Sequence, residues 1–130
     1  ALVMAAAVSD YRPAVRAENK IKKEQHDHLN IELTENPDIL YGLGQKKTHQ
    51  FLVGFAAETR DVIEYGKAKL AKKNLNLLVA NDVAQQGAGF NVSTNIAALI
   101  YKDGHIEQYL KMTKDDLGHI IIEKIAEGIN

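Results

Sequence analysis

The chain has 130 residues, of which 45% are hydrophobic and 25% are charged. This composition is ordinary for a folded domain and excludes a disordered or fibrous chain. The formal charge of -1, from 16 Lys+Arg and 17 Asp+Glu, gives no basic field that would indicate a nucleic-acid partner. Because there is no cysteine, disulfides, thiolate chemistry and cysteine-ligated zinc are excluded.

The first apolar run, residues 1–8, is too short to span a bilayer and lacks the basic flank of a signal peptide. We therefore expect a cytoplasmic protein with no membrane partner. The chain opens inside this strand-like run, without an initiator Met. We interpret residues 1–130 as a single domain that is the C-terminal portion of a larger one.

Short apolar runs alternate with amphipathic stretches, which is typical of an α/β domain with a mainly parallel sheet. Continuous apolar runs predict buried central strands at 1–8, 50–57 and 75–80. Strict alternation at 29–34 predicts a half-buried strand. The polar stretch 9–23 is interpreted as a loop of functional size.

Asn36-Pro37-Asp38 predicts a helix start, with Asn36 as the cap and Pro37 in the first helical position. Its buried stripe is expected to contain Ile39, Leu40 and Leu43. A second helix is predicted over 61–73, with Thr59 as its cap.

Near the C-terminus, Asp103-Gly104 predicts an antiparallel hairpin between strands at 96–101 and 106–110. Residues 81–95 between the sheet strands are interpreted as a glycine-containing loop. Thr113 with Asp116 resembles a capping box before a final helix. The buried face of that helix is expected to contain Leu117, Ile120, Ile121 and Ile125.

Two polar features follow the first predicted strand, where ligands bind in open α/β sheets. Asp10 suits a ribose hydroxyl or Mg²⁺, and the alternative is a turn-forming aspartate. The run Lys20-Ile21-Lys22-Lys23 suits phosphate or an anionic transition state. A solvated charge run is the alternative.

Three further features can be explained either by ligand binding or by structure alone. Backbone N–H groups at the helix start 36–40 suit phosphate or a base edge, although capping alone explains the residues. Phe55 with the alanines after it suits a flat ligand, although Phe55 also suits the core. Lys69 and Lys73 share a helix face and suit a triphosphate, or they complement the helix dipole.

Other familiar motifs are missing. Gly87-Ala88-Gly89 lacks the third glycine and the following helix of a dinucleotide fingerprint. The five histidines have no metal-ligand spacing, and no Ser-His-Asp arrangement is evident. An NAD-dependent oxidoreductase is therefore disfavoured, and the lysines suit a triphosphate better than NAD.

Six sets of residues, in order along nearly the whole chain, resemble motifs of the phosphopantothenoylcysteine synthetase family, the C-terminal half of a bifunctional bacterial coenzyme A biosynthesis protein. They are Ala5-Ala6-Ala7-Val8-Ser9-Asp10-Tyr11-Arg12-Pro13, Lys20-Ile21-Lys22-Lys23, Asn36-Pro37-Asp38-Ile39, Gly54-Phe55-Ala56-Ala57-Glu58-Thr59, Lys72-Lys73-Asn74-Leu75 with Ala80-Asn81-Asp82-Val83, and Gly89-Phe90 with Asn95.

The resemblance implies a Rossmann-like, mainly parallel sheet and a ligase that uses CTP to join 4′-phosphopantothenate to cysteine. It implies that the carboxylate becomes an acyl-cytidylate with release of pyrophosphate, and that cysteine then displaces CMP. Mg²⁺ would offset the repulsion between the two anionic substrates. FMN belongs only to the fused decarboxylase half, which these residues do not contain.

The resemblance also implies residue roles. Lys20 would be catalytic and would bind the nucleotide phosphates, and Asp10 would bind the nucleotide or its Mg²⁺. Residues 24–28 would form a flap. The other implied nucleotide-binding residues are Met4, Ala5, Ala6, Pro37, Asp38, Ile39, Leu40, Phe55, Lys69 and Lys73.

The family forms homodimers, and Asn81-Asp82 is expected near the dimer contact or the active site. The family's catalytic Asn and part of its phosphopantothenate site precede the residues present here. We therefore expect nucleotide contacts without turnover by the chain alone. A non-catalytic nucleotide-binding or dimerisation module is the alternative, and the sequence leaves the choice between CTP and ATP open.

Overall fold

The computed structural model describes residues 1–22, 28–58, 60–82 and 94–129. The chain divides into two compact units. The sheet unit consists of Ala1–Ala5 and Ile39–Asn130, and the hairpin unit consists of Ala6–Asp38. Among the helices of the described residues, none has the length and apolar content needed to cross a membrane.

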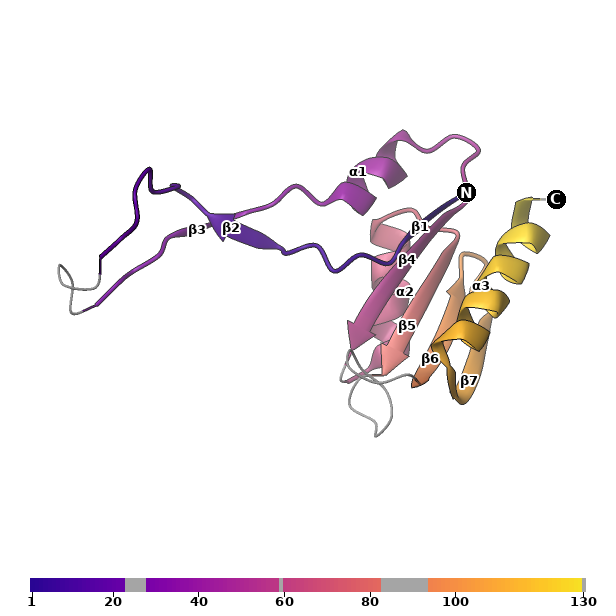
Figure 1. The fold of residues 1–130 in the computed structure, drawn as a ribbon. Coiled ribbons are helices and arrows are strands. Elements are labelled where there is room, and N and C mark those ends of the chain that lie inside the picture. The colour runs from indigo at the N-terminus through magenta and orange to yellow at the C-terminus, as the bar shows by residue number, and fades with distance from the viewer. Residues whose placement is uncertain (23–27, 59, 83–93, 130) are drawn as a thin grey trace. The chain divides into compact units, whose positions relative to one another are not determined.

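Within the described residues, the sheet unit contains a five-stranded sheet with the strand order β1-β4-β5-β6-β7 (Figure 1). Its strands are β1 (Leu2–Met4), β4 (Leu52–Glu58), β5 (Leu77–Asp82), β6 (Thr94–Tyr101) and β7 (Ile106–Thr113). The first three are parallel, and β6 and β7 form an antiparallel hairpin that joins β5 antiparallel. The predicted α/β class and the C-terminal hairpin are confirmed.

The prediction of a buried central strand at 1–8 is wrong for this chain. Only Leu2–Met4 form a strand, and it lies at the sheet edge beside β4. Leu2 and Val3 are 37% and 41% exposed. A continuous apolar run indicates a strand suited to burial, but it does not say how many neighbours that strand has.

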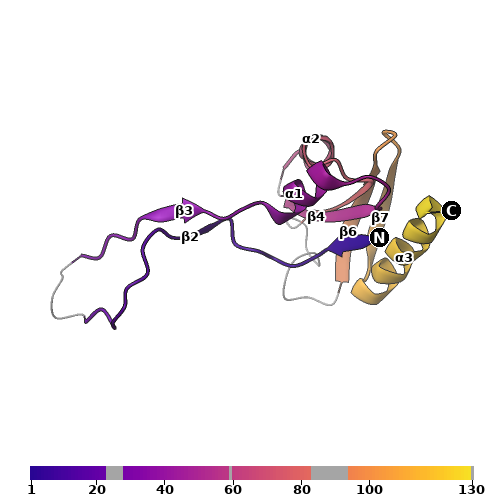
Figure 2. The same cartoon turned by 90° about the horizontal axis from the view of Figure 1, so that it is seen from above.

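Three helices of the described residues cover the sheet: α1 (Ile39–Lys46), α2 (Val62–Lys72) and α3 (Lys114–Ile129). The first two lie on one face and α3 lies on the other (Figure 2). Helix α1 begins at Ile39, so Asn36 is not its cap, and Ile39 is exposed rather than buried. The N-cap of α2 is Asp61, so the prediction of Thr59 as its cap is wrong, and Thr59 itself lies outside the described residues.

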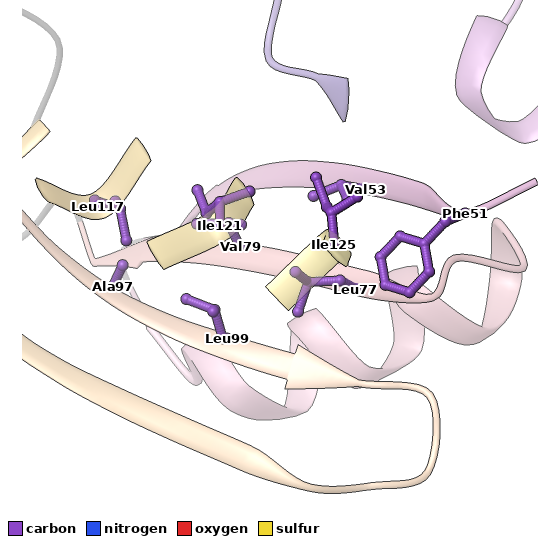
Figure 3. Packing of buried hydrophobic residues seen from close by; sticks show 9 residues of the cluster. All are labelled: Phe51, Val53, Leu77, Val79, Ala97, Leu99, Leu117, Ile121 and Ile125. Atoms are coloured by element: carbon purple, nitrogen blue, oxygen red, sulfur yellow. The ribbon is translucent and has the colours of Figure 1, made fainter. Parts of the chain in front are cut away.

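Alternating residues of the strands face opposite helices, as the two-residue period of a strand requires. On one face, Val53, Leu77 and Leu99 are fully buried against α3 (Figure 3). The predicted buried residues of α3 are confirmed, with Leu117, Ile121 and Ile125 buried and Ile120 packed beside them. On the other face, buried sheet residues meet helices α1 and α2 through Leu40 and Leu70.

The predicted capping box of α3 is also confirmed. The backbone N–H of Asp116 donates to Thr113 Oγ1 at 3.1 Å, and the Thr113 hydroxyl donates to Asp116 Oδ2 at 2.6 Å. Both bonds hold the first turn of α3 where β7 ends, so the helix starts at once after the strand.

The hairpin unit contains β2 (Tyr11–Pro13) and β3 (Leu33–Glu35), which pair antiparallel. The loop predicted over 9–23 therefore includes a strand that the sequence analysis missed. The strand predicted over 29–34 is shorter than expected, and it is not half-buried in this unit. Leu29, Ile31 and Leu33 are 56%, 60% and 55% exposed.

Candidate functional site

The hairpin unit brings Asp10 to the segment that leads into α1. The backbone N–H of Asn36 donates to the carbonyl of Asp10 at 2.8 Å, and Asn36 Nδ2 donates to the carbonyl of Ser9 at 2.8 Å. Arg12 closes the junction, because its Nη1 donates to the Glu35 carbonyl at 2.7 Å and to Asn36 Oδ1 at 3.0 Å. Asp10 therefore lies beside Asn36, the residue that precedes Pro37 and Asp38.

This junction explains why Asn36 does not cap α1. Its side chain is used between the two strands, as donor to one backbone segment and acceptor from Arg12. Two of the predicted nucleotide-binding segments, 5–13 and 36–39, thus meet at Asp10 and Asn36. The sequence could have indicated this pairing, since the alternating stretch 29–34 lies between the two motifs and ends next to the second one.

The Asp10 carboxylate is exposed, and its chemistry fits Mg²⁺. Mg²⁺ is commonly held by one or two carboxylates together with substrate phosphates. Among the described residues, no group of three or more His, Cys, Asp or Glu side chains could hold a metal ion without a substrate. Asp10 alone thus offers one carboxylate, and the other ligands of a bound Mg²⁺ would be phosphate oxygens and water.

Ala6 and Lys20 also lie in the hairpin unit, and both are exposed. The predicted flap 24–28 falls mostly outside the described residues, as does Gly87-Ala88-Gly89. Of the flap, His28 is described, and it is exposed.

In the sheet unit, Met4 and Leu40 belong to the same side of the core. Met4 is half-buried and packs against the core cluster that contains Leu40, on the face covered by α1 and α2. Gly54 allows Leu40 to approach β4, because a Cβ at Gly54 would lie 2.8 Å from Leu40 Cδ2. Ala5 and Ile39 are exposed beside these two residues in the sequence.

Phe55 lies on the opposite face of the sheet. It is half-buried and packs against the cluster that α3 covers. The described sheet unit therefore does not place Phe55 on the same surface as Met4 and Leu40. The alternation of β4 is the cause, since Gly54 and Phe55 are adjacent and must face opposite ways.

Lys69 and Lys73 lie at the C-terminal end of α2, where the Lys73 N–H donates to the Lys69 carbonyl at 3.0 Å. This end of the helix approaches α1, because a Cβ on Gly44 would lie 1.9 Å from the Lys73 carbonyl oxygen. The two lysines are thus brought together as predicted from their spacing. They stand near the start of β5, whereas Phe55 lies on the other face.

A third lysine, Lys47, lies at the same end of the sheet. Its Nζ donates to the Asn74 carbonyl at 2.7 Å and to Asn76 Oδ1 at 2.8 Å. Burial lowers the pKa of Lys47, and repulsion from Lys102 lowers it further. The strand starts therefore carry a cationic, hydrogen-bonded surface that the motifs did not indicate.

Sequence reasoning named Asn81 and Asn95 but missed their pairing, and it missed a polar group around Glu107. At the end of β5, Asn95 Nδ2 donates to Asn81 Oδ1 at 2.8 Å. On the β7 side, Glu107 accepts hydrogen bonds from Tyr101 at 3.1 Å and from Tyr109, and pairs with Lys124 at 3.1 Å. No spacing rule signals the bonds from Asn95 to Asn81 and from Tyr101 to Glu107, because each joins residues of different strands.

The Glu107 group has shifted titrations. The hydrogen bond from Tyr109 is the main reason that the pKa of Glu107 is lowered. The same bond raises the pKa of Tyr109, while burial is the main cause of the raised pKa of Tyr101. Tyr101 and Tyr109 therefore stay protonated and donate to a charged Glu107 at neutral pH.

Residues 1–129 match the model of a family described as the DNA/pantothenate metabolism flavoprotein C-terminal domain. The chain is 46% identical over 125 residues to the "Coenzyme A biosynthesis bifunctional protein CoaBC" of Bacillus subtilis, covering 96% of this chain and 30% of that protein. The protein of the same name from Escherichia coli is 44% identical, with 93% and 30% covered. The chain thus spans about a third of the length of these relatives.

Solved structures show the same fold. The crystal structure of the C-terminal domain of a bifunctional CoaBC protein matches with a TM-score of 0.70 and 38% identity, covering 92% of this chain and 50% of that one. A flavoprotein of this class from Streptococcus pneumoniae matches with a TM-score of 0.68, 24% identity, and 95% and 58% coverage. The Rossmann-like fold and the resemblance noted from the six motifs are confirmed, and the chain belongs to the DNA/pantothenate metabolism flavoprotein C-terminal domain family.

Proposed function

We propose that this chain is the nucleotide-binding part of a ligase in coenzyme A biosynthesis, which joins 4′-phosphopantothenate to cysteine at the expense of CTP. The observation that carries the proposal is the similarity over nearly the whole chain to bifunctional coenzyme A biosynthesis proteins. The meeting of Asp10 with the 36–38 segment supports it, because two of the family's nucleotide motifs lie side by side there.

The proposed reaction has two steps. The substrate carboxylate attacks the α-phosphorus of CTP, which forms an acyl-cytidylate and releases pyrophosphate. The amine of cysteine then attacks the acyl carbon, loses its proton, and releases CMP. Both steps bring anions together, so fixed cationic groups lower their barriers.

The chain's own residues have defined tasks in this proposal. Lys20 neutralises the phosphate oxygens as charge builds on them, and Asp10 is the residue that would hold Mg²⁺. Mg²⁺ supplies charge neutralisation at the phosphates when bound. The other residues that the resemblance implies as nucleotide-binding are Met4, Ala5, Ala6, Pro37, Asp38, Ile39, Leu40, Phe55, Lys69 and Lys73, and of these Phe55 lies on the sheet face opposite Met4 and Leu40.

The homodimer expected from the family remains part of the proposal. The apolar side chains that the hairpin unit exposes, such as Val15 at 82% and Ile31 at 60%, support it because paired chains would remove them from water. Sedimentation of the purified protein checks this point, and a monomer at all concentrations would contradict it.

The test is calorimetric titration of CTP with Mg²⁺, with ATP as competitor. It is run on this chain, on the full-length product of the gene that encodes it, and on Lys20→Ala in both. We expect CTP to bind the full-length protein and Lys20→Ala to weaken binding at least tenfold, with Lys22→Ala as the matched control from the same run.

Turnover separates the two candidate functions. Pyrophosphate release that requires both 4′-phosphopantothenate and CTP supports the ligase. CTP binding by a full-length protein that releases no pyrophosphate would favour the non-catalytic module. Normal turnover by residues 1–130 alone would contradict the expectation that this part needs residues beyond it.

A further inference from the structure

Helix α2 ends in a turn that favours glycine but contains an asparagine. Asn74 has a positive φ of 51°, which residues with a side chain seldom adopt. Its backbone N–H donates to the carbonyl of Ala71 at 3.2 Å, and the N–H of Leu75 donates to the carbonyl of Leu70 at 3.0 Å. This pair of bonds is a Schellman motif, in which glycine is the usual residue at the position of Asn74. The backbone of the turn therefore does not explain the asparagine.

The side chain of Asn74 is used to hold α2 to α1. Its Nδ2 donates at 2.9 Å to the carbonyl of Gly44, a buried residue of α1. Its Oδ1 accepts from Lys102 Nζ at 3.2 Å. The backbone carbonyl of Asn74 accepts from Lys47 Nζ at 2.7 Å, and Lys47 directly follows α1. Asn74 thus joins the end of α2 to two points at the end of α1.

Helices α1 and α2 both carry residues that the family resemblance implies as nucleotide-binding. Leu40 belongs to α1, and Lys69 and Lys73 lie at the end of α2. Lys73 immediately precedes Asn74, and its carbonyl oxygen would lie 1.9 Å from a Cβ at Gly44. The backbone that carries the Lys73 side chain is therefore held closely against α1. A side chain on a fixed backbone loses less freedom when it binds a ligand than one on a mobile backbone.

We propose that Asn74 and Lys47 are positioning residues that fix the end of α2 against α1 and so hold Lys69 and Lys73 in place for the phosphate oxygens of the nucleotide. The inference rests on the proposed function, because the nucleotide is assigned to these two lysines there. Lys47 and Lys102 donate to uncharged oxygens of Asn74, so these bonds do not neutralise their charge, which adds to the attraction for an anion.

The decisive variant is Asn74→Gly in the full-length protein. Glycine adopts the positive φ without strain and keeps the Schellman turn, but it removes the side-chain bonds to Gly44 and Lys102. Relief of the strained φ offsets part of the lost bonding, so the thermal unfolding midpoint should change little. Calorimetry with CTP and Mg²⁺ should show about fivefold weaker binding.

Lys67→Ala is the matched control for the loss of affinity. Lys67 is an exposed residue of α2 that pairs with Glu64 of the same helix at 3.6 Å. The variant removes a charge from α2 and leaves the bonds between Asn74 and α1 in place. It should bind CTP with wild-type affinity.

A double-mutant cycle shows whether Asn74 acts through the two lysines. In a variant that carries both Lys69→Ala and Lys73→Ala, the addition of Asn74→Gly should weaken CTP binding no further. Lys47→Met should weaken CTP binding in the wild-type background, and Lys47→Arg should restore part of it. In steady-state assays of Asn74→Gly, the KM for CTP should rise and the KM for 4′-phosphopantothenate should stay at its wild-type value.

The outcomes that overturn the inference are distinct from those that overturn the proposed function. Wild-type affinity in Asn74→Gly, together with weak binding when both lysines are replaced, would refute the positioning role and leave the proposed function standing. An equal loss from Asn74→Gly with and without the lysines would also refute it, because Asn74 would then act on the fold as a whole. If the wild type does not bind CTP, the proposed function fails and the positioning role fails with it.

Discussion

The sheet unit and the hairpin unit are each stabilised by a different kind of interaction. In the sheet unit, Val53, Leu77 and Leu99 are fully buried between the strands and α3. In the hairpin unit, the described apolar side chains are exposed, with Val15 at 82% and Leu33 at 55%. The hairpin unit is held instead by backbone pairing of β2 with β3 and by hydrogen bonds of the Arg12 and Asn36 side chains.

The two units also differ in how stable each is without a ligand. Burial gives the sheet unit its own stability, because apolar side chains removed from water dominate folding. A two-stranded hairpin without a core is only marginally stable. Asp10 and Lys20, the residues with the most chemistry in the proposal, therefore lie on the unit that depends least on burial and that a ligand or a second chain can stabilise most.

The largest expected effect tests burial directly. Leu99→Ala removes a fully buried side chain from the core that α3 covers, and we expect it to lower the free energy of unfolding by about 2–5 kcal/mol. Ile31→Ala in the hairpin unit is the matched control and should change it by less than about 0.5 kcal/mol. Urea unfolding of both variants provides the measurement, and similar losses in the two would break the comparison.

A backbone contact inside the sheet unit provides the next effect. A Cβ at Gly44 would lie 1.9 Å from the carbonyl oxygen of Lys73, so Gly44→Ala must push α1 away from α2. We expect a loss of about 1–3 kcal/mol. Gly42→Ala in the same helix meets nothing within 4 Å and should be neutral or stabilising by up to about 1 kcal/mol. A neutral Gly44→Ala in thermal unfolding would show that the two helices do not pack tightly.

A pH effect is expected to be smaller. Because the pKa of Glu107 is lowered in the folded protein, chiefly by the hydrogen bond from Tyr109, its contribution to stability is complete above the ordinary glutamate pKa of 4.5. That contribution is lost as the pH falls through the lower folded-state value. The thermal unfolding midpoint should therefore fall less steeply from pH 7 to pH 3 in Glu107→Gln than in the wild type. Parallel curves would show that the hairpin β6–β7 gains nothing from this charge.

Much of the sheet unit could be predicted from the sequence, because burial produces periodic patterns. The apolar runs at 50–57 and 75–80 and the stripe of α3 led to the right elements, and the Thr113–Asp116 capping box was correct. The prediction of a central strand at 1–8 was wrong, since the position of a strand at the edge depends on which strands pair with it. Periodicity reports the face that is buried and carries no information on the order of strands.

The candidate site was less predictable, because it depends on pairings between distant residues. The spacing of Lys69 and Lys73 correctly indicated that they lie one turn apart at the end of α2, but it could not show that Phe55 lies on the face of the sheet that α3 covers. The role of Asn36 was wrong, because Ser9 and Arg12 compete for the side chain that would otherwise cap α1. The bond from Asn95 to Asn81 joins two strands and leaves no local signal.

The smallest effect on global stability is expected from Arg12→Met, and it tests whether the two units are independent. The variant keeps the apolar stem but removes the donors to the Glu35 carbonyl and to Asn36. Amide hydrogens of Ala14 and Asn36, which bridge the hairpin strands, should exchange about fivefold faster, equivalent to roughly 1 kcal/mol. The amide of Leu99 should exchange at its wild-type rate, because the core of the sheet unit does not depend on Arg12. Faster exchange at Leu99 would mean that the units unfold together, and the stability of the sheet would then include the hairpin that carries Asp10 and Lys20.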